Sequence, residues 1–394
     1  MNMKLKSIVT AIAFAASFSA FAADPIKIGL SGPFTGGSSP MGVSMRDGVK
    51  LAAAEINAKG GILGRKIDLI ERDDQADNGR GVQVAQELIN KEGVVATVGY
   101  INTGVSLASQ RFYEEAKIPV INNVATGSLI TKQFLPPDFA DNYVFRTSAN
   151  DGIQSSMIVE EALDVHKFSK VAILADSTNY GQLGRADLEK ALTAKGVTPV
   201  AVEKFNIKDV DMTAQLLKSK EAGAQAILTY GIGPELAQIA NGMEKLGWKV
   251  PMIGSWTLSM GNFIDNAGKN GNGALMPQTF IQEGNTPKRK AFIAAYVKAY
   301  KPANGRIPSP VSAAQGYDSM YILAAAITQA GDTNGVKVRE ALENLNAKID
   351  GVVTTYDHPY THDNHEAIVR SMVVMGEVKD GHVVYADKAD QKVK

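Results

Sequence analysis

Two threonines stand where apolar, strand-like runs give way to helix-like runs. Residues 94–98 predict a strand buried on both faces, residues 104 onward predict the first turns of a helix, and between them stand Ile101, Asn102 and Thr103. The next such junction contains Val124, Ala125 and Thr126, and a second helical stretch is predicted from Leu129. The first backbone N–H groups of a helix have no partner inside it, so each junction could hold an anion.

Two such junctions side by side would converge on one anionic group, such as a carboxylate, without an arginine or a lysine. Each hydrogen bond to a charged group contributes on the order of 1.5 to 3 kcal/mol. The alternative is that Thr103 and Thr126 only cap their helices.

The elements that position these junctions alternate along the chain. Strand-like runs occupy 26–30, 66–72, 94–98 and 118–122, with helical stretches at 42–58 and 83–90. A second series has strands at 171–175, 200–205, 226–230 and 252–254, with helices at 184–195, 213–220 and 235–246. This alternation predicts right-handed βαβ units, and the length exceeds what one core usually holds. We therefore predict an α/β protein with two doubly wound parallel sheets, whose ligands lie beyond the carboxyl ends of the strands.

Other chemistry is less well supported. Histidine and acidic residues are closely spaced near the end of the chain and could bind a metal: His358, His362, Asp363, His365 and Glu366. The polar residues around them favour an exposed turn instead. Asp73 and Asp74 could act as an acid and a base, but we favour loop capping. The glycine-rich segment 268–273 lacks the ending of a phosphate-binding loop. The G-x-S-x-G, H-E-x-x-H and Walker patterns are absent, so we predict no enzymatic activity, no metal and no cofactor.

The beginning of the chain predicts export. Residues 1–23 match a signal peptide, because Lys4 and Lys6 precede an apolar run and Ala20-Phe21-Ala22 fits the cleavage pattern. The sequence has no cysteine, and its 41 basic and 41 acidic residues become slightly acidic in sum once the signal is removed. We expect a monomeric periplasmic protein that neither binds nucleic acid nor inserts into a membrane.

The chain resembles the periplasmic solute-binding proteins of the leucine/isoleucine/valine-binding family, which feed ABC importers. Segments that carry the resemblance include IKIGLSGPFTG, GVKLAAAEINAKGGILGRKIDLIERDD, VGYINTGVSLAS and FRTSANDGIQ. The resemblance implies the type I fold, with two lobes joined by three crossings near 147–150, 273–280 and 352–356. It places residues 24–148 and 278–354 in an N-terminal lobe and residues 149–277 and 355–394 in a C-terminal lobe.

The resemblance also implies a ligand site between the lobes. The ligand carboxylate would be held by Thr103 with the backbone of Ile101 and Asn102, and by Thr126 with the backbone around Val124 and Ala125. Tyr180 would cover the ligand from the second lobe, and Phe280 and Met41 would line the pocket for its side chain.

This chain departs from the family pattern at two positions. Trp256 stands where an acidic residue binds the ligand amine, and Ile232 or Gly233 stands where a tyrosine supports it. A buried ammonium without a carboxylate costs several kcal/mol, whereas micromolar affinity amounts to about 8 kcal/mol. We therefore expect a hydrophobic acid without an amine, such as a benzoate. Alternatively, Trp256 belongs to the core, Glu235 or Glu283 meets the amine, and the ligand is like a branched-chain amino acid.

The expected function is ligand capture for an ABC permease and its ATPase. The alternative is a sensory protein that presents its ligand to a membrane receptor.

Overall fold

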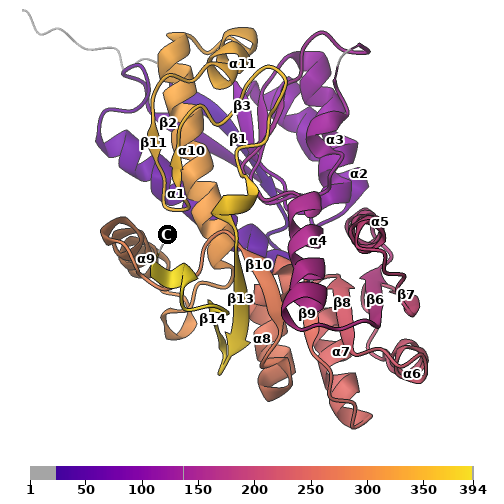
Figure 1. The fold of residues 1–394 in the computed structure, drawn as a ribbon. Coiled ribbons are helices and arrows are strands. Elements are labelled where there is room, and N and C mark those ends of the chain that lie inside the picture. Colours follow the sequence, from indigo (N-terminus) through magenta and orange to yellow (C-terminus); the bar gives the residue numbers. More distant parts are fainter. Residues whose placement is uncertain (1–23, 136, 393–394) are drawn as a thin grey trace, which may run out of the picture.

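Two separate sheets organise the chain, one in the upper and one in the lower half of Figure 1. The computed structural model describes residues 24–135 and 137–392, so the predicted signal peptide lies outside the described residues. The first sheet has five parallel strands in the order β2-β1-β3-β4-β5. Its strands are β1 (Ile26–Gly32), β2 (Ile67–Asp73), β3 (Ala96–Gly99), β4 (Val120–Asn122) and β5 (Val144–Arg146). Parallel strands bring their carboxyl ends to one edge, and the two threonine junctions follow β3 and β4 there.

Helices cover the first sheet. α1 packs along α10, and α2 packs on α3. The helices of this lobe are α1 (Ser39–Ala58), α2 (Asn78–Gln86), α3 (Thr103–Ala116), α9 (Pro287–Tyr300), α10 (Pro310–Ala330) and α11 (Gly335–Glu343). The stretch after Leu129 forms only a three-residue 3₁₀ turn, Ile130–Lys132, so the second predicted helix is wrong.

The second sheet has seven strands in the order β14-β13-β10-β9-β8-β6-β7. They are β6 (Val171–Asp176), β7 (Ala201–Phe205), β8 (Ala226–Tyr230), β9 (Met252–Gly254), β10 (Leu275–Gln278), β13 (Val374–Lys379) and β14 (His382–Tyr385). The strands from β6 to β10 are parallel, and β13 and β14 join as an antiparallel hairpin at the edge. Its helices are α4 (Asp151–Glu160), α5 (Asn179–Ala194), α6 (Thr213–Glu221), α7 (Gly233–Lys245) and α8 (Gly261–Ala267).

Three segments connect the lobes. Residues 147–150 lead from β5 to α4. Residues 279–286 lead from β10 to α9, later than the predicted 273–280, because residues 275–278 form a strand of the second sheet. The third segment differs from the prediction at 352–356. A small hairpin, β11 (Ile349–Asp350) with β12 (Thr355–Tyr356), precedes a backbone pairing in which the Arg146 N–H donates to the His365 carbonyl and the Ala367 N–H donates to the Arg146 carbonyl. The chain thus stays beside β5 through Ala367 and crosses only between there and β13.

One hydrophobic cluster runs through both lobes. It joins Met41 and Ile101 of the first lobe to Ile232, Trp256 and Met260 of the second. Polar contacts also cross the gap: Ser128 Oγ donates to Asp187 Oδ2 at 2.5 Å, and Asn262 Nδ2 donates to the Gly37 carbonyl at 2.8 Å. The lobes are therefore closed on one another. In the described part of the chain, no helix has both the length and the apolar character needed to cross a bilayer.

Candidate functional site: a cavity between the lobes

A narrow cavity of about 10 Å³, which has room for about one water molecule, lies where the closed lobes meet. Its wall comes from both of them and consists of Ser38, Met41, Ile101, Asn102, Thr126, Tyr180, Ile232, Trp256, Thr257 and Met260. None of these ten residues carries a charge. Seven of them were predicted from the sequence to touch a ligand, and Ser38, Thr257 and Met260 were not.

Residues at the N-termini of helices from both lobes line this cavity. Ser38 precedes α1, Asn102 precedes α3 and Ile232 precedes α7, while Tyr180 is the second residue of α5. Neither Ser38 nor Asn102 caps its own helix through its side chain; instead, Asn102 Nδ2 donates to Ser38 Oγ at 3.1 Å. The N-terminus of a helix carries a partial positive charge and unpaired N–H groups. Their convergence makes an uncharged cavity favourable for an anion.

The two predicted threonines have different roles. Thr126 lies in the cavity wall, whereas Thr103 lies outside it and accepts a hydrogen bond from the Gly127 N–H at 3.1 Å. Residue 127 must be glycine for this approach, because a Cβ there would lie 2.3 Å from Thr103 Cγ2. Thr103 therefore links the two junctions, and the expectation that its hydroxyl faces a ligand is not supported.

The segment Val124–Ser128 is held from several sides. The Arg146 guanidinium donates to the Gly127 carbonyl at 2.7 Å, and Ser148 Oγ donates to the Ala125 carbonyl at 2.8 Å. Val124 and Ala125, which the sequence placed at the ligand, are buried and are not part of the cavity wall.

A buried ion pair fixes Arg146 in turn. Its Nε donates to Glu366 Oε2 at 2.8 Å, and Glu366 also accepts from Thr131 and Asn150. Burial opposes the charge of Glu366, but the guanidinium outweighs burial and holds the pKa of Glu366 below its usual value. Residues 365–366 thus belong to the supporting structure of the site, although the sequence favoured an exposed turn.

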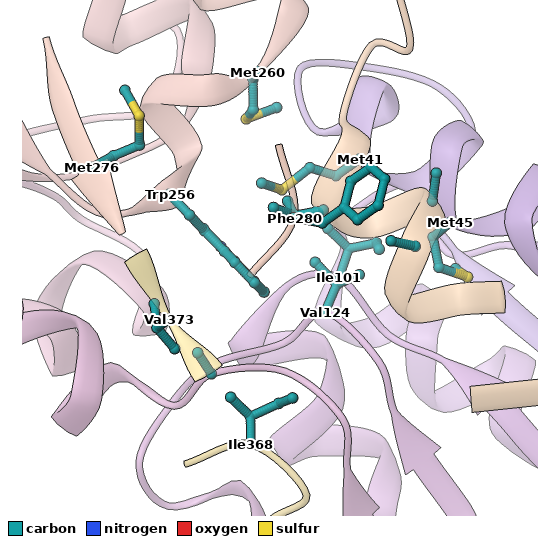
Figure 2. Packing of buried hydrophobic residues seen from close by; sticks show 14 of the residues in the cluster. Met41, Met45, Ile101, Val124, Trp256, Met260, Met276, Phe280, Ile368 and Val373 are labelled. Carbon is teal, nitrogen blue, oxygen red and sulfur yellow. The ribbon is translucent and has the colours of Figure 1, made fainter. Parts of the chain in front are cut away.

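Two aromatic residues close the cavity from the second lobe. Trp256 is 2% exposed and extends toward Ile101 and Val124 of the first lobe, as Figure 2 shows. Its backbone N–H donates to Gln154 Oε1 at 3.0 Å, which ties it to α4. Tyr180 donates to Ser255 Oγ at 2.5 Å. Trp256 is both part of the core and part of the wall, so the two alternatives raised from the sequence are not exclusive.

Phe280 and the two candidate glutamates lie elsewhere. Phe280 packs edge-on against Phe292, with ring centroids 5.7 Å apart, and is not part of the wall. Glu235 accepts from the Lys208 N–H at 2.6 Å, and Glu283 accepts from Gln391 Nε2 at 2.7 Å. Neither glutamate reaches the cavity, so the structure gives them no contact with an amine there.

A carboxylic acid that the sequence analysis missed lies directly behind the wall. Asp151 is fully buried, and its N–H donates to the Thr126 carbonyl at 2.9 Å. Neither of its carboxyl oxygens has a hydrogen-bond partner of acceptable geometry among the described residues. Burial raises its pKa to about 7. Its position directly after a crossing was visible in the sequence; its orientation toward Thr126 was not.

The remaining candidates have structural roles. Asp73 accepts from the Phe34 and Gln75 N–H groups, both at 2.9 Å, and Asp74 accepts from Ser31 Oγ at 3.1 Å, as expected for loop capping. His365 stacks on Phe145, with ring centroids 4.0 Å apart. Across the described ranges, no three histidine, cysteine or acidic side chains are arranged to hold a metal ion. Residues Gly268–Gly271 form a short 3₁₀ turn after α8.

Comparison with known proteins finds a family that matches nearly the whole chain and a relative of similar length. The sequence model of a family described as "Periplasmic binding protein" matches residues 25–382. The "Leucine-, isoleucine-, valine-, threonine-, and alanine-binding protein" of Pseudomonas aeruginosa is 29% identical over 334 residues, which cover 84% of this chain and 85% of that protein.

Two solved structures share the fold. One is the branched-chain amino acid transporter substrate-binding protein LivJ of Streptococcus pneumoniae in complex with isoleucine, with a TM-score of 0.79, 25% identity, and coverage of 91% of this chain and 97% of that one. The other is a solute-binding protein of an ABC transporter from R. palustris in complex with benzoate, with a TM-score of 0.78, 21% identity, and coverage of 92% and 95%.

Proposed function

We propose, on the premise that this chain belongs to the periplasmic binding protein family, that it captures a small apolar carboxylic acid between its lobes and delivers it to an ABC importer. The observation that carries the proposal is the uncharged cavity between the lobes, onto which helix N-termini converge. A ligand that touches both lobes stabilises the closed arrangement, and this is how binding is signalled to a transporter.

The carboxylate end of the ligand would lie against the first lobe. Thr126 supplies a hydroxyl, and the N-termini of α1 and α3 supply a favourable potential beside Ser38 and Asn102. These are dipoles rather than charges, so they attract an anion without the strong desolvation that a buried arginine would add.

The apolar end would lie against Trp256, Met260, Met41 and Ile232. A flat indole face suits an aromatic ring or an aliphatic chain, and methionine adapts to either shape. The benzoate complex of a protein with the same fold supports this class of ligand for the fold. For the lobes we propose residues 24–148 and 279–367 in the first and residues 149–278 and 368–392 in the second, supported by the place of β10 in the second sheet and by the backbone pairing of Arg146 with residues 365–367.

A second candidate ligand is an amino acid with an apolar side chain. Two observations favour it: Asp151 is a buried carboxyl next to Thr126 that no cation pairs closely, and Asn102 Oδ1 is a buried acceptor without a described partner. The relative from Pseudomonas aeruginosa is named for amino acids of this kind. The two candidates differ in whether the ligand carries an ammonium.

Removing the hydroxyl of Thr126 tests the placement of the carboxylate. A thermal-shift screen of benzoate, 4-hydroxybenzoate and 4-methylpentanoate first identifies the acid that binds best. For that acid we expect the variant Thr126→Val to raise the calorimetric Kd about 10- to 100-fold, because a hydrogen bond to a charged group is lost.

The matched control is Thr97→Val, which makes the same change at a fully buried strand position outside the cavity wall. We expect its Kd to equal that of the wild type. If Thr126→Val bound the acid as tightly as the wild type, the ligand carboxylate would not lie at Thr126.

A further inference from the structure

Asp151 is a buried carboxyl group whose backbone is bonded to Thr126, the residue that supplies the proposed carboxylate position. It is the first residue of α4 and follows the first crossing, where its N–H holds the Thr126 carbonyl. Its side chain lies close enough to Thr126 for that side chain to favour its charged form. Since Thr126 is in the cavity wall, a carboxylate bound there would have a second carboxyl group as its neighbour.

The groups around Asp151 do not neutralise it. Arg146 on β5 is the nearby cation, but its guanidinium is engaged by Glu366 and by the Gly127 carbonyl. α5 contributes Asp187, which adds negative charge, and the neutral Tyr180; β8 contributes the neutral Tyr230. No donor among the described residues meets either carboxyl oxygen with good hydrogen-bond geometry, although the hydroxyls of Thr126 and Tyr230 lie close enough to favour the charged form.

Two adjacent carboxylates in a buried site cannot both be ionised without a large penalty. We propose that Asp151 is a specificity residue that carries a proton while the ligand carboxylate is bound, and that it thereby admits acids without an amine. The proton comes from solvent and stays on an Asp151 oxygen, so no covalent bond of the ligand changes. Burial already raises the pKa of the free carboxyl to about 7, and so the proton is available near neutral pH.

This inference rests on the proposed function and makes the affinity depend on pH in a definite direction. The ionised form of Asp151 repels the ligand, so binding weakens as the pH rises above about 7. Between about pH 6 and about pH 8.5 we expect the Kd of the acid to rise about 30-fold, since one proton is required per ligand bound.

The test measures this dependence by calorimetry in the wild type and in Asp151→Asn, with the best-binding of benzoate, 4-hydroxybenzoate and 4-methylpentanoate. We expect Asp151→Asn to keep the low-pH affinity and to lose the pH dependence. The matched control is Asp74→Asn, since Asp74 is also buried, with a pKa raised by burial to about 6, but lies outside the wall. It should retain the wild-type slope.

A measurement on the wild type alone covers the case in which Asp151→Asn does not fold. Calorimetry near pH 7.5 in buffers of different ionisation enthalpy should show proton uptake on binding of the acid. No uptake, or one Kd at both pH values, would overturn the role of Asp151 and leave the proposed function intact.

Two other results would be decisive in different ways. Failure of all three acids to bind at either pH would contradict the proposed function itself. Leucine binding that strengthens as the pH rises, and is lost in Asp151→Asn, would make Asp151 a counter-ion for an ammonium and overturn the inference.

Discussion

The variant Trp256→Glu is expected to weaken binding of the hydrophobic acid at least ~100-fold. The change removes the flat apolar face that Trp256 gives to the cavity and places a negative charge in a wall that has none. A carboxylate buried against the apolar end of the ligand loses its hydration without gaining a partner, which costs several kcal/mol, whereas a 100-fold change requires only ~2.7 kcal/mol. The measurement is the calorimetric Kd.

The variant Trp256→Phe is the control, because it keeps a ring without adding charge. We expect it to weaken binding less than ~10-fold, and its melting temperature to show that this buried position tolerates substitution. Trp256 would be a core residue without a role in binding if Trp256→Glu folded and bound the acid like the wild type.

The variant Glu366→Ala is expected to lower the free energy of unfolding by about 3 to 5 kcal/mol, measured by urea denaturation. It leaves the fully buried guanidinium of Arg146 without its carboxylate and removes the acceptor for Thr131 and Asn150. An uncompensated buried charge is among the costliest defects that one substitution can introduce.

The variant Glu160→Ala is its control. Glu160 also pairs with an arginine, Arg370, at 2.9 Å, but the two side chains are 42% and 51% exposed. An exposed pair contributes about 0 to 1 kcal/mol. Equal losses in the two variants would show that the Arg146–Glu366 pair does not support the first lobe.

The sequence predicted the sheets well because their strands are strongly apolar. The runs at 94–98 and 171–175 became β3 and β6, each buried throughout. Such strands are easy to recognise in a sequence, because a strand covered on both faces is an almost continuous apolar run. The junction after β3 followed from these assignments, whereas the place of Trp256 in the site came from the resemblance to the binding-protein family.

The third crossing could not be predicted in the same way. Residues 358–366 are polar and contain a proline, as an exposed loop does. They lie beside β5 because of contacts with a strand more than 200 positions earlier, above all the Arg146–Glu366 pair. Neither partner carries a local signal of that pairing.

The sequence also could not predict which way the side chains point within the junctions. Tyr100 has a φ of 64° and the preceding Gly99 a φ of 155°, so the backbone turns sharply between β3 and Asn102. That turn decides which side chains line the cavity: Asn102 does, and Thr103 instead meets Gly127. Asp151 was overlooked because its importance depends on burial beside Thr126, which spacing does not reveal.

The central claim is that the cavity selects a carboxylate without an ammonium. The most direct measurement is calorimetric titration near pH 6.5 with leucine and with 4-methylpentanoate, which differ only by the amine. We predict that 4-methylpentanoate binds at least ~10-fold more tightly, since the ammonium finds no carboxylate in the cavity wall. Tighter binding of leucine would contradict the claim.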